Sequence, residues 1–277
     1  TIVNTESASY GWGIHLVQAA DSNTINNCTI NINQTSTSSS FAGIIATNSN
    51  TSTGSYANNA NYTMVSNTTV NGGYYGVRFN GLSATYNMNN SVMNSTFNEV
   101  SFYGVYNIYQ EAPMASGNTV NFRSSATGGY GVYINNSIHG NVQSNFINGA
   151  KTYGIYFFTH NQASKNPTVR GLVANNMITA LNFGDGIYFS NADQMDVFHN
   201  TVTAENDQAL WINSTSEDYD IRNNVFSASG TSQVIDLDAN PAITDVINNN
   251  VYFHSGGGDI AITPGGTYAT LVAWQTG

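Results

Sequence analysis

Two aspartates, Asp185 and Asp207, offer the best pair of groups for acid–base chemistry in this chain. Each stands just before a short apolar segment, and the spacing predicts that the two carboxyls lie diagonally on neighbouring repeats. Paired carboxyls can hydrolyse a glycosidic bond, and His199 follows in the next part of the chain. Isolated aspartates beside turns, however, commonly serve the turn itself. Since the six basic residues are also dispersed, we assign no catalytic residue from the sequence.

Asp236 and Asp238 form a weak candidate for a metal site. They flank Leu237, so in a strand both carboxylates face outward, and Asn213 of the preceding repeat is predicted to lie beside Asp238. Oxygen ligands of this kind suit calcium. The pattern supplies no third or fourth obvious ligand, and the five histidines share no metal-ligand spacing. We therefore expect no cofactor, with calcium as the single weak candidate.

A column of aromatic residues is the candidate binding surface. Five consecutive repeats carry an aromatic residue at the same outward position, namely Tyr106, Tyr133, Tyr156, Tyr188 and Trp211. Sugar rings stack on flat, amphipathic aromatic surfaces of this kind, so these residues form our candidate carbohydrate-binding site. An alternative stays open, because aromatic pairs across strands stabilise a sheet by roughly 0.2 to 1 kcal/mol each without any ligand.

The repeats that position these residues recur every 23 to 33 residues. Each contains a short strand, usually opened by glycine, and the apolar centres are Ile14, Ile44, Val77, Val105, Val132, Ile155, Ile187, Leu210, Ile235 and Ile260. Asparagines form a second series, each followed two or three residues later by an apolar residue: Asn27, Asn67, Asn94, Asn118, Asn145, Asn176, Asn200, Asn224 and Asn250. The apolar runs are short and alternate with period two, which excludes helical repeats. This pattern predicts an all-β solenoid, a parallel β-helix of about ten coils.

The asparagine series predicts a ladder. The asparagine side chain is short, tolerates the left-handed backbone of a sharp corner and can hydrogen-bond to the same group one coil away. The plainer interpretation is that asparagine merely marks loops. That interpretation does not explain the regular offset before apolar residues such as Val120 and Ile178. We therefore expect stacked asparagines along one corner of the rod.

Composition limits the partners of the chain. Charged residues make up 8% of it, the net charge is −10, and the lysines and arginines form no cluster. Nucleic acid and anionic membrane surfaces need a positive footprint, so neither is expected as a partner. The unbroken repeat predicts one elongated domain over residues 1–277, without a membrane-spanning run. The single cysteine, Cys28, excludes an internal disulfide.

Several runs also carry a family resemblance. The segment Gly154, Ile155, Tyr156 and Phe157, and the pair Asn175 and Asn176 before Met177 and Ile178, resemble the right-handed parallel β-helix repeats of pectate-lyase-like proteins. Polygalacturonase-like members carry adjacent aspartates and a Gly-His-Gly signature, which the surroundings of Asp185 and His199 match poorly. Lyase members use a basic cluster and calcium-binding acids, which the dispersed basic residues do not provide.

The C-terminal residues 268–277 are similar to a segment that follows the last coils in large secreted β-helix proteins of bacteria with type IX secretion. In those proteins the chain usually continues beyond this segment. Because this chain also begins at Thr1 without methionine, we expect a fragment of a longer exported protein.

Three repeats carry insertions in the same part of the coil, between the apolar strand and the following asparagine, at residues 47–61, 81–90 and 158–168. We expect loops that project from one side of the rod, where repeat proteins often build binding surfaces.

These observations favour a non-catalytic module, secreted or on the cell surface, that acts as a stalk or adhesin and binds neutral polysaccharide or a cell-surface glycan. Further domains of the same polypeptide are its other expected partners. The alternative from another class is a pectinase-like glycoside hydrolase or polysaccharide lyase, and the third is a purely structural spacer. The fold cannot choose among them, because this scaffold hosts both enzymes and inert rods.

Overall fold

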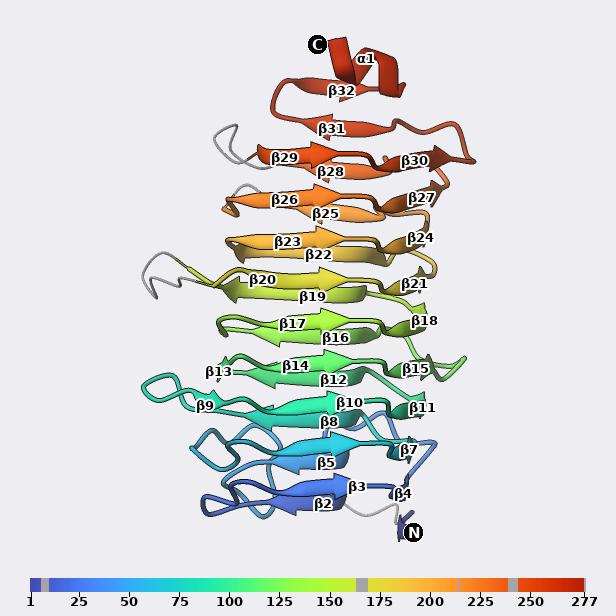
Figure 1. Cartoon of the computed structure of the whole chain (residues 1–277). Helices are drawn as coiled ribbons and strands as arrows, with labels where there is room; N and C mark the ends of the chain where they lie inside the picture. Colours follow the sequence, from blue (N-terminus) through green and yellow to red (C-terminus); the bar gives the residue numbers. More distant parts are fainter. Residues whose placement is uncertain (6–9, 163–168, 214, 239–243, 277) are drawn as a thin grey trace.

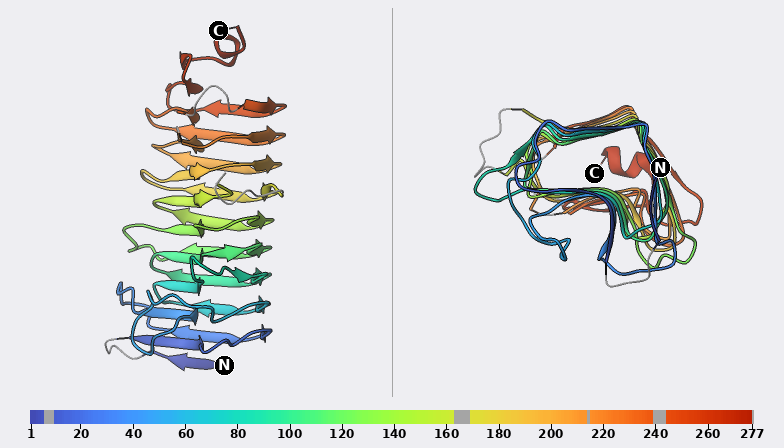
Figure 2. Two further views of the ribbon diagram at one scale, coloured as in Figure 1. Left: turned by 90° about the vertical axis from the view of Figure 1, so that its left-hand side faces the viewer. Right: turned by 90° about the horizontal axis from the view of Figure 1, so that it is seen from below.

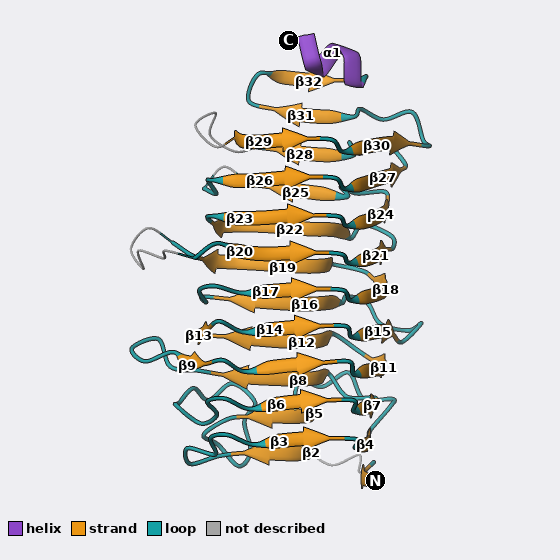
Figure 3. Ribbon diagram, viewed as in Figure 1, coloured by secondary structure: helices purple, strands orange, loops and turns teal. Residues whose placement is uncertain are grey.

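The computed structural model describes residues 1–5, 10–162, 169–213, 215–238 and 244–276. The chain winds into a solenoid in which every turn adds one strand to each of three sheets (Figures 1 and 3). The described strands of these sheets are parallel except for one antiparallel pair, between the last two strands at the C-terminal end. Nine complete turns lie within the described residues, close to the ten coils that the repeats predict. The all-β, parallel β-helix class is therefore confirmed.

The three long sheets are named A, B and C. Sheet B carries the apolar marks and contains, in order, β2 (Gly11–Leu16), β5 (Phe41–Ala46), β8 (Tyr75–Asn80), β12 (Tyr103–Ile108), β16 (Tyr130–Asn135), β19 (Tyr153–His160), β22 (Asp185–Ala192), β25 (Leu210–Ile212), β28 (Ile235–Leu237), β31 (Ala261–Thr263) and β32 (Gly266–Tyr268). Sheet C contains β3 (Thr24–Asn26), β6 (Met64–Ser66), β10 (Ser91–Met93), β14 (Met114–Ser116), β17 (Asn141–Gln143), β20 (Gly171–Ala174), β23 (Met195–Phe198), β26 (Tyr219–Arg222) and β29 (Thr244–Asn248). Sheet A contains β1 (Ile2–Asn4), β4 (Thr29–Ile32), β7 (Thr69–Asn71), β11 (Thr96–Val100), β15 (Thr119–Phe122), β18 (Phe146–Ala150), β21 (Met177–Ala180), β24 (Thr201–Glu205), β27 (Val225–Ser229) and β30 (Val251–His254).

Aliphatic side chains from all three sheets fill the interior of the solenoid. In sheet B the apolar centres of the repeats pair in register from Ile14 to Ile235, as the sequence predicts. The predicted centre of the last repeat, Ile260, is wrong by one residue, because Ala261 pairs with Ile235 and is fully buried. Ile260 and Ile262 flank Ala261 and are only partly buried, so the inward residue of this strand is smaller than either of its apolar neighbours.

The corner between sheets C and A holds a column of stacked asparagines, which are buried except for the half-buried Asn250 at its C-terminal end. In each step the side-chain amide nitrogen of one asparagine donates to Oδ1 of the next at 2.9–3.0 Å, through Asn118, Asn145, Asn176, Asn200, Asn224 and Asn250. The backbone N–H of each donor residue bonds to the same oxygen. In the first turns Cys28, Thr68 and Ser95 occupy this column, and the Thr68 N–H donates to Ser95 Oγ at 3.1 Å.

The other three asparagines of the predicted series stand one residue earlier in their turns. Asn27, Asn67 and Asn94 have a left-handed backbone, with φ between 47° and 54°. The expectation that one asparagine both takes the left-handed corner and stacks was wrong. In a typical turn Asn175 has a φ of 57° and an exposed side chain, while Asn176 is buried and has a negative φ. The division follows from geometry, since the corner residue points to solvent and the next residue points inward.

The corner between sheets B and C carries the insertions (Figure 2). The insertion at 81–90 contains β9 (Asn87–Met88), which pairs with β13 (Gln110–Glu111). The insertion at 47–61 does not simply project, because it folds back over the outer face of sheet B. Thr53 Oγ1 donates to Ser39 O at 2.9 Å, and Asn80 Nδ2 donates to Thr53 O at 2.8 Å. In the third insertion, residues 163–168 lie outside the described residues.

The C-terminal end of the solenoid is covered by helix α1 (Leu271–Thr276) (Figure 2). Its Trp274 ring meets Tyr252 edge-on, with 5.4 Å between the ring centroids. In the described part of the chain no helix has the length and apolar character that crossing a bilayer requires.

Candidate functional site

The predicted aromatic column is present on the outer face of sheet B. Register pairs Tyr106, Tyr133, Tyr156, Tyr188 and Trp211 in five successive strands. Their rings stack with centroids 4.8, 4.7, 4.8 and 4.3 Å apart and with 6° to 21° between their planes. The strand spacing of a parallel sheet equals the preferred separation of offset-stacked rings, so regular stacking is expected here.

A second aromatic column, which the alternation of the sequence did not predict, runs beside the first. It contains Tyr75, Tyr103, Tyr130 and Tyr153, and each of these stands three residues before the outward residue of its own strand. The Tyr103 ring lies 5.0 Å from that of Tyr106. Period-two alternation would place residues three apart on opposite faces, but Gly104 and Val105 both face inward. A Cβ on Gly104 would come within 2.8 Å of the Val120 side chain, so only glycine fits there. The repeated motif Tyr-Gly-Val-Tyr was the available signal.

The N-terminal end of the two columns is closed. The Arg78 guanidinium lies 4.7 Å from the Tyr75 ring centroid and 4.8 Å from that of Tyr106. It also donates to Tyr75 Oη at 2.5 Å and to Asn80 Oδ1 at 2.7 Å. The 47–61 loop covers this part of the face, and Tyr106 is only 7% exposed. The partly exposed rings of the first column therefore begin at Tyr133, whereas those of the second column begin at Tyr103.

Stacking changes how this surface can meet a sugar. In the first column each of Tyr133, Tyr156 and Tyr188 has a neighbouring ring over both faces. The sequence predicted that sugar rings stack on the aromatic faces, but in these three residues the faces are already occupied by other rings. Ring edges and phenol hydroxyls are what Tyr133 and Tyr156 present to solvent, whereas Tyr188 is only 8% exposed. Burial raises the pKa of Tyr106 to about 12 and that of Tyr133 further, so the hydroxyls stay protonated and can donate hydrogen bonds.

Carboxyl groups lie at the C-terminal end of the same face. Asp185 pairs in register with Tyr153 of the second column and is 3% exposed. Its side chain contacts that of Asp207 as the sequence predicted, and the N–H of Gln208 donates to both, at 3.2 Å to Asp185 and 3.1 Å to Asp207. Burial and the adjacent Asp207 carboxyl raise the pKa of Asp185 to about 8. At neutral pH the pair therefore holds a proton.

Asp236 adds a further carboxyl in the next turn of the solenoid. It pairs in register with Trp211, is 8% exposed, and accepts a hydrogen bond of 2.6 Å from Gln233 Nε2 on Oδ2. Burial, followed by the neighbouring Asp238, raises its pKa to about 6. Asp236 Oδ1 and Trp211 Nε1 are both buried and have no hydrogen-bond partner in the described structure. Trp211 and Asp236 are neighbours in register at the C-terminal end of the aromatic column. They leave one buried donor and one buried acceptor without a hydrogen-bond partner.

Other groups considered in the sequence do not join this site. His199 lies in the left-handed turn between β23 and β24, at the corner of sheets C and A, and so away from Asp185 on sheet B. His160 ends β19, is fully buried, and has a pKa lowered to about 3 by burial, which keeps it neutral. Within the described residues no group of three or more histidine, cysteine, aspartate or glutamate side chains could hold a metal ion. Asp236 and Asp238 thus lack a third ligand of these types.

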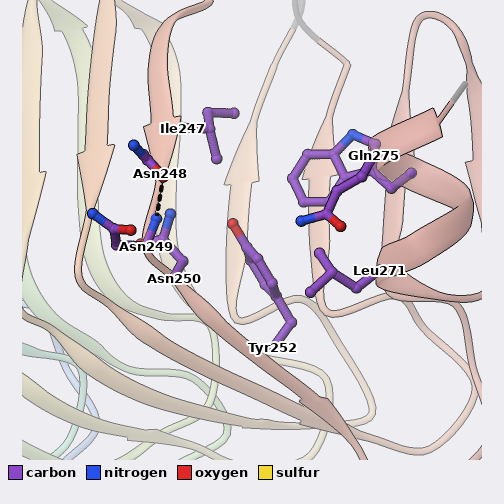
Figure 4. Close-up of a pocket in the computed structure, with 8 residues that line it drawn as sticks. Ile247, Asn248, Asn249, Asn250, Tyr252, Leu271 and Gln275 are labelled. Carbon is purple, nitrogen blue, oxygen red and sulfur yellow. Dashed lines mark hydrogen bonds between the residues drawn. The ribbon is translucent and has the colours of Figure 1, made fainter.

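A cavity of about 170 Å³ lies beneath helix α1 (Figure 4). Asn248, Asn249 and Tyr252 from the last turn and Leu271 and Gln275 from the helix contribute to its lining. The Asn249 N–H donates to Asn248 Oδ1 at 2.8 Å. None of the predicted site residues lines this cavity.

A parallel solenoid of three sheets with a stacked asparagine corner defines the class of protein. The chain belongs to the family described as right handed beta helix region, whose model matches residues 53–226, more than half of the chain. This agrees with the resemblance to pectate-lyase-like repeats. A comparison with curated proteins finds no match.

Two solved structures are similar at low identity. One is the GH136 lacto-N-biosidase from Eubacterium ramulus, with 13% identity and a TM-score of 0.45 over 88% of this chain and 45% of that chain. The other is the periplasmic alginate epimerase AlgG, with 13% identity and a TM-score of 0.41 over 90% of this chain and 78% of that chain. This chain thus spans less than half the length of the lacto-N-biosidase.

Proposed function

We propose that this chain is a glycan-binding module of an exported protein, and that the glycan lies along the outer face of sheet B between Tyr133 and Asp236. The observation that carries the proposal is the pair of buried, unpaired polar atoms, Trp211 Nε1 and Asp236 Oδ1. Leaving a buried polar atom unpaired costs about 1–3 kcal/mol. Both atoms are covered in this structure, so a neighbouring side chain must move before a sugar hydroxyl can accept from the indole N–H or donate to the carboxylate.

The aromatic columns supply the rest of the proposed surface. Ring edges and protonated phenol hydroxyls between Tyr133 and Trp211 offer apolar contact and hydrogen bonds over several turns, at about 4.8 Å per turn. An extended polysaccharide matches such a strip better than a monosaccharide does. Export, a place on the cell surface, and the type IX route stay predictions from the sequence resemblance, together with a stalk or adhesin role.

The test replaces the unpaired donor alone. In Trp211→Phe the ring keeps its stacking on Tyr188 but loses the N–H, so retention in affinity electrophoresis on neutral glycans should weaken about two- to tenfold. The matched control is Trp12→Phe, because Trp12 Nε1 already donates to Ser40 O at 2.9 Å. That variant should lose stability and keep glycan retention. Unretarded migration of the wild-type protein in every glycan would leave the structural spacer as the better account.

A second candidate, glycoside hydrolysis, is favoured by the proton that the Asp185 and Asp207 pair holds. A carboxylic acid with a raised pKa can protonate a leaving oxygen. Because Asp185 and Asp207 touch, they are closer than the roughly 5 to 9.5 Å that separates the two carboxyls of glycosidases, so Asp236 would have to be the second group. We expect no reducing ends to be released from a panel of plant and algal polysaccharides. Release that is lost in Asp185→Asn would instead establish the hydrolase.

A further inference from the structure

The backbone that follows β30 folds around the imidazole ring of His254, the last residue of that strand. His254 Nε2 lies 2.6 Å from Ser232 O, and Nδ1 accepts hydrogen bonds from the N–H groups of Gly256 at 3.0 Å and Gly258 at 3.1 Å. A carbonyl oxygen only accepts and a backbone N–H only donates. The partners therefore require a neutral ring with its proton on Nε2.

These three hydrogen bonds, which we call the latch, join two turns of the solenoid. Ser232 lies between β27 and β28 of one turn, and the loop at 256–258 belongs to the next. The backbone approaches the ring closely, because a Cβ on Gly258 would come within 2.5 Å of both His254 Nε2 and Ser232 O. Only glycine fits there.

The latch stands at the start of the segment that covers the C-terminal end of the solenoid, residues 255–276, which we call the cap (Figure 2). Beyond the latch the cap is joined to sheet B by two register pairs, between β28 and β31. Its β32 pairs with β31 of the cap itself. Trp274 adds an edge-on contact with Tyr252. A terminal segment with so few connections opens locally at low free energy, so loss of the latch should loosen it.

Protonation of His254 is incompatible with the latch. An imidazolium has two N–H donors and no acceptor, so a proton on Nδ1 would face the N–H groups of Gly256 and Gly258, and both hydrogen bonds would be lost. We propose that the latch is a pH-sensitive switch, closed at neutral pH and released in mild acid, and that its release frees the loop and loosens the cap. A free imidazole titrates near pH 6.5, so below this pH the ratio of open to closed loop should approach a tenfold rise per pH unit.

Few other titratable groups face His254. Its register partner is Ala228 on β27, and among the described residues of β27, of 230–233 and of the loop at 255–259, only Asp259 titrates. Glu205 ends β24, the strand beyond β27. Asp236, on the strand that β31 joins, has the opposite effect, because burial raises its pKa to about 6 and acid then stabilises the folded state through this group. The test of the latch must therefore be local.

Hydrogen exchange of the whole chain, measured between about pH 7.5 and about pH 5.5 and corrected for the intrinsic exchange rates, tests the proposal. Protection of the Gly256 and Gly258 amides, and of the rest of the cap, should fall about five- to tenfold between about pH 6.5 and about pH 5.5. Amides in the middle of the solenoid, such as that of Val197 on β23, should keep their protection.

His254→Gln removes the titration. Glutamine can still donate and accept hydrogen bonds but takes up no proton in this range, so the cap should lose its pH dependence whatever its protection at neutral pH. The matched control is His15→Gln at the other end of sheet B, where His15 Nε2 is bonded to Thr47 O, and this variant should keep the pH dependence. If His254→Gln responds to acid as the wild type does, another group such as Asp259 is responsible, and the proposal is overturned.

Nitrogen NMR of the His254 ring in the wild-type chain is a second measurement that needs no variant. Nδ1 should stay unprotonated while the Gly256 and Gly258 amides are protected, and it should gain its proton together with the loss of that protection. A protonated ring beside amides that remain protected would show that the hydrogen bonds tolerate the proton, and would reject the switch. Cap protection that does not change with pH in the wild type would reject it as well.

Discussion

The side-chain oxygen of Asn176 accepts two hydrogen bonds from Asn145, one from its backbone N–H at 3.0 Å and one from its side-chain amide at 2.9 Å. The Asn176 amide in turn donates to Asn200 Oδ1 and to Val142 O, both at 2.9 Å. One side chain thus connects three turns of the solenoid. Its neighbour Asn175 takes the left-handed corner and is exposed.

Replacing Asn176 by leucine should therefore lower the free energy of unfolding by about 2 to 4 kcal/mol, because buried donors and acceptors on both neighbouring turns lose their partners. Asn175→Gly is the matched control, since glycine adopts the left-handed backbone without strain and should change stability little. Denaturant melts measure both. Similar losses at the two positions would contradict the division of roles at this corner.

The solenoid interior contains a buried amide, that of Asn107, whose replacement should raise the stability of the fold. Asn107 lies between Phe79 and Ile134 in an inward column, is 1% exposed, and neither of its side-chain polar atoms has a partner. Asn107→Leu should raise the free energy of unfolding by about 1 to 3 kcal/mol, because an unpaired buried amide is replaced by an apolar group.

The control for Asn107 is Asn80, which is also fully buried but donates to Thr53 O and accepts from Arg78. Asn80→Leu should lower stability instead. Thermal melts of the two variants should move in opposite directions. A loss of stability in Asn107→Leu would mean that the amide has a partner in solution, such as a bound water.

Stability should fall as the pH rises from about 4 to about 8. The folded-state pKa of Asp185 is raised to about 8 and that of Asp236 to about 6, whereas both are near 3.9 in the unfolded chain. Between these values the folded state holds more protons than the unfolded state, so the slope of unfolding free energy against pH is negative. Asp185→Asn should flatten this slope and gain roughly 2 to 4 kcal/mol near pH 8 relative to wild type. Denaturant melts across this range give the slope directly.

Arg78 should hold the 47–61 loop in place. Its guanidinium bonds to Asn80, and Asn80 bonds to Thr53 O within the loop. Arg78→Leu should cost about 1 to 3 kcal/mol and expose the loop to limited proteolysis. Arg222→Gln removes an exposed pair with Asp220 and should cost less than about 1 kcal/mol. Unchanged cleavage in Arg78→Leu would show that the loop is held by other contacts.

The sequence by itself determined the solenoid. Apolar residues such as Val132 and Ile155 recur with the period of one turn, and since every turn meets only its neighbours, local repetition is enough to specify sheets, interior and register. The outward aromatic column followed for the same reason. Where larger apolar residues flank a small inward one, as Ile260 and Ile262 flank Ala261, the predicted register is wrong by one residue.

The tertiary structure decided what those positions do. Period-two alternation hides the Tyr103 column, because the close approach of backbones at Gly104 turns two consecutive residues inward. The sequence cannot show that stacking covers the aromatic faces, since this depends on side-chain rotamers across turns. Nor can it show that Trp211 Nε1 and Asp236 Oδ1 are left unpaired, because hydrogen-bond satisfaction depends on the position of every neighbouring donor and acceptor after packing.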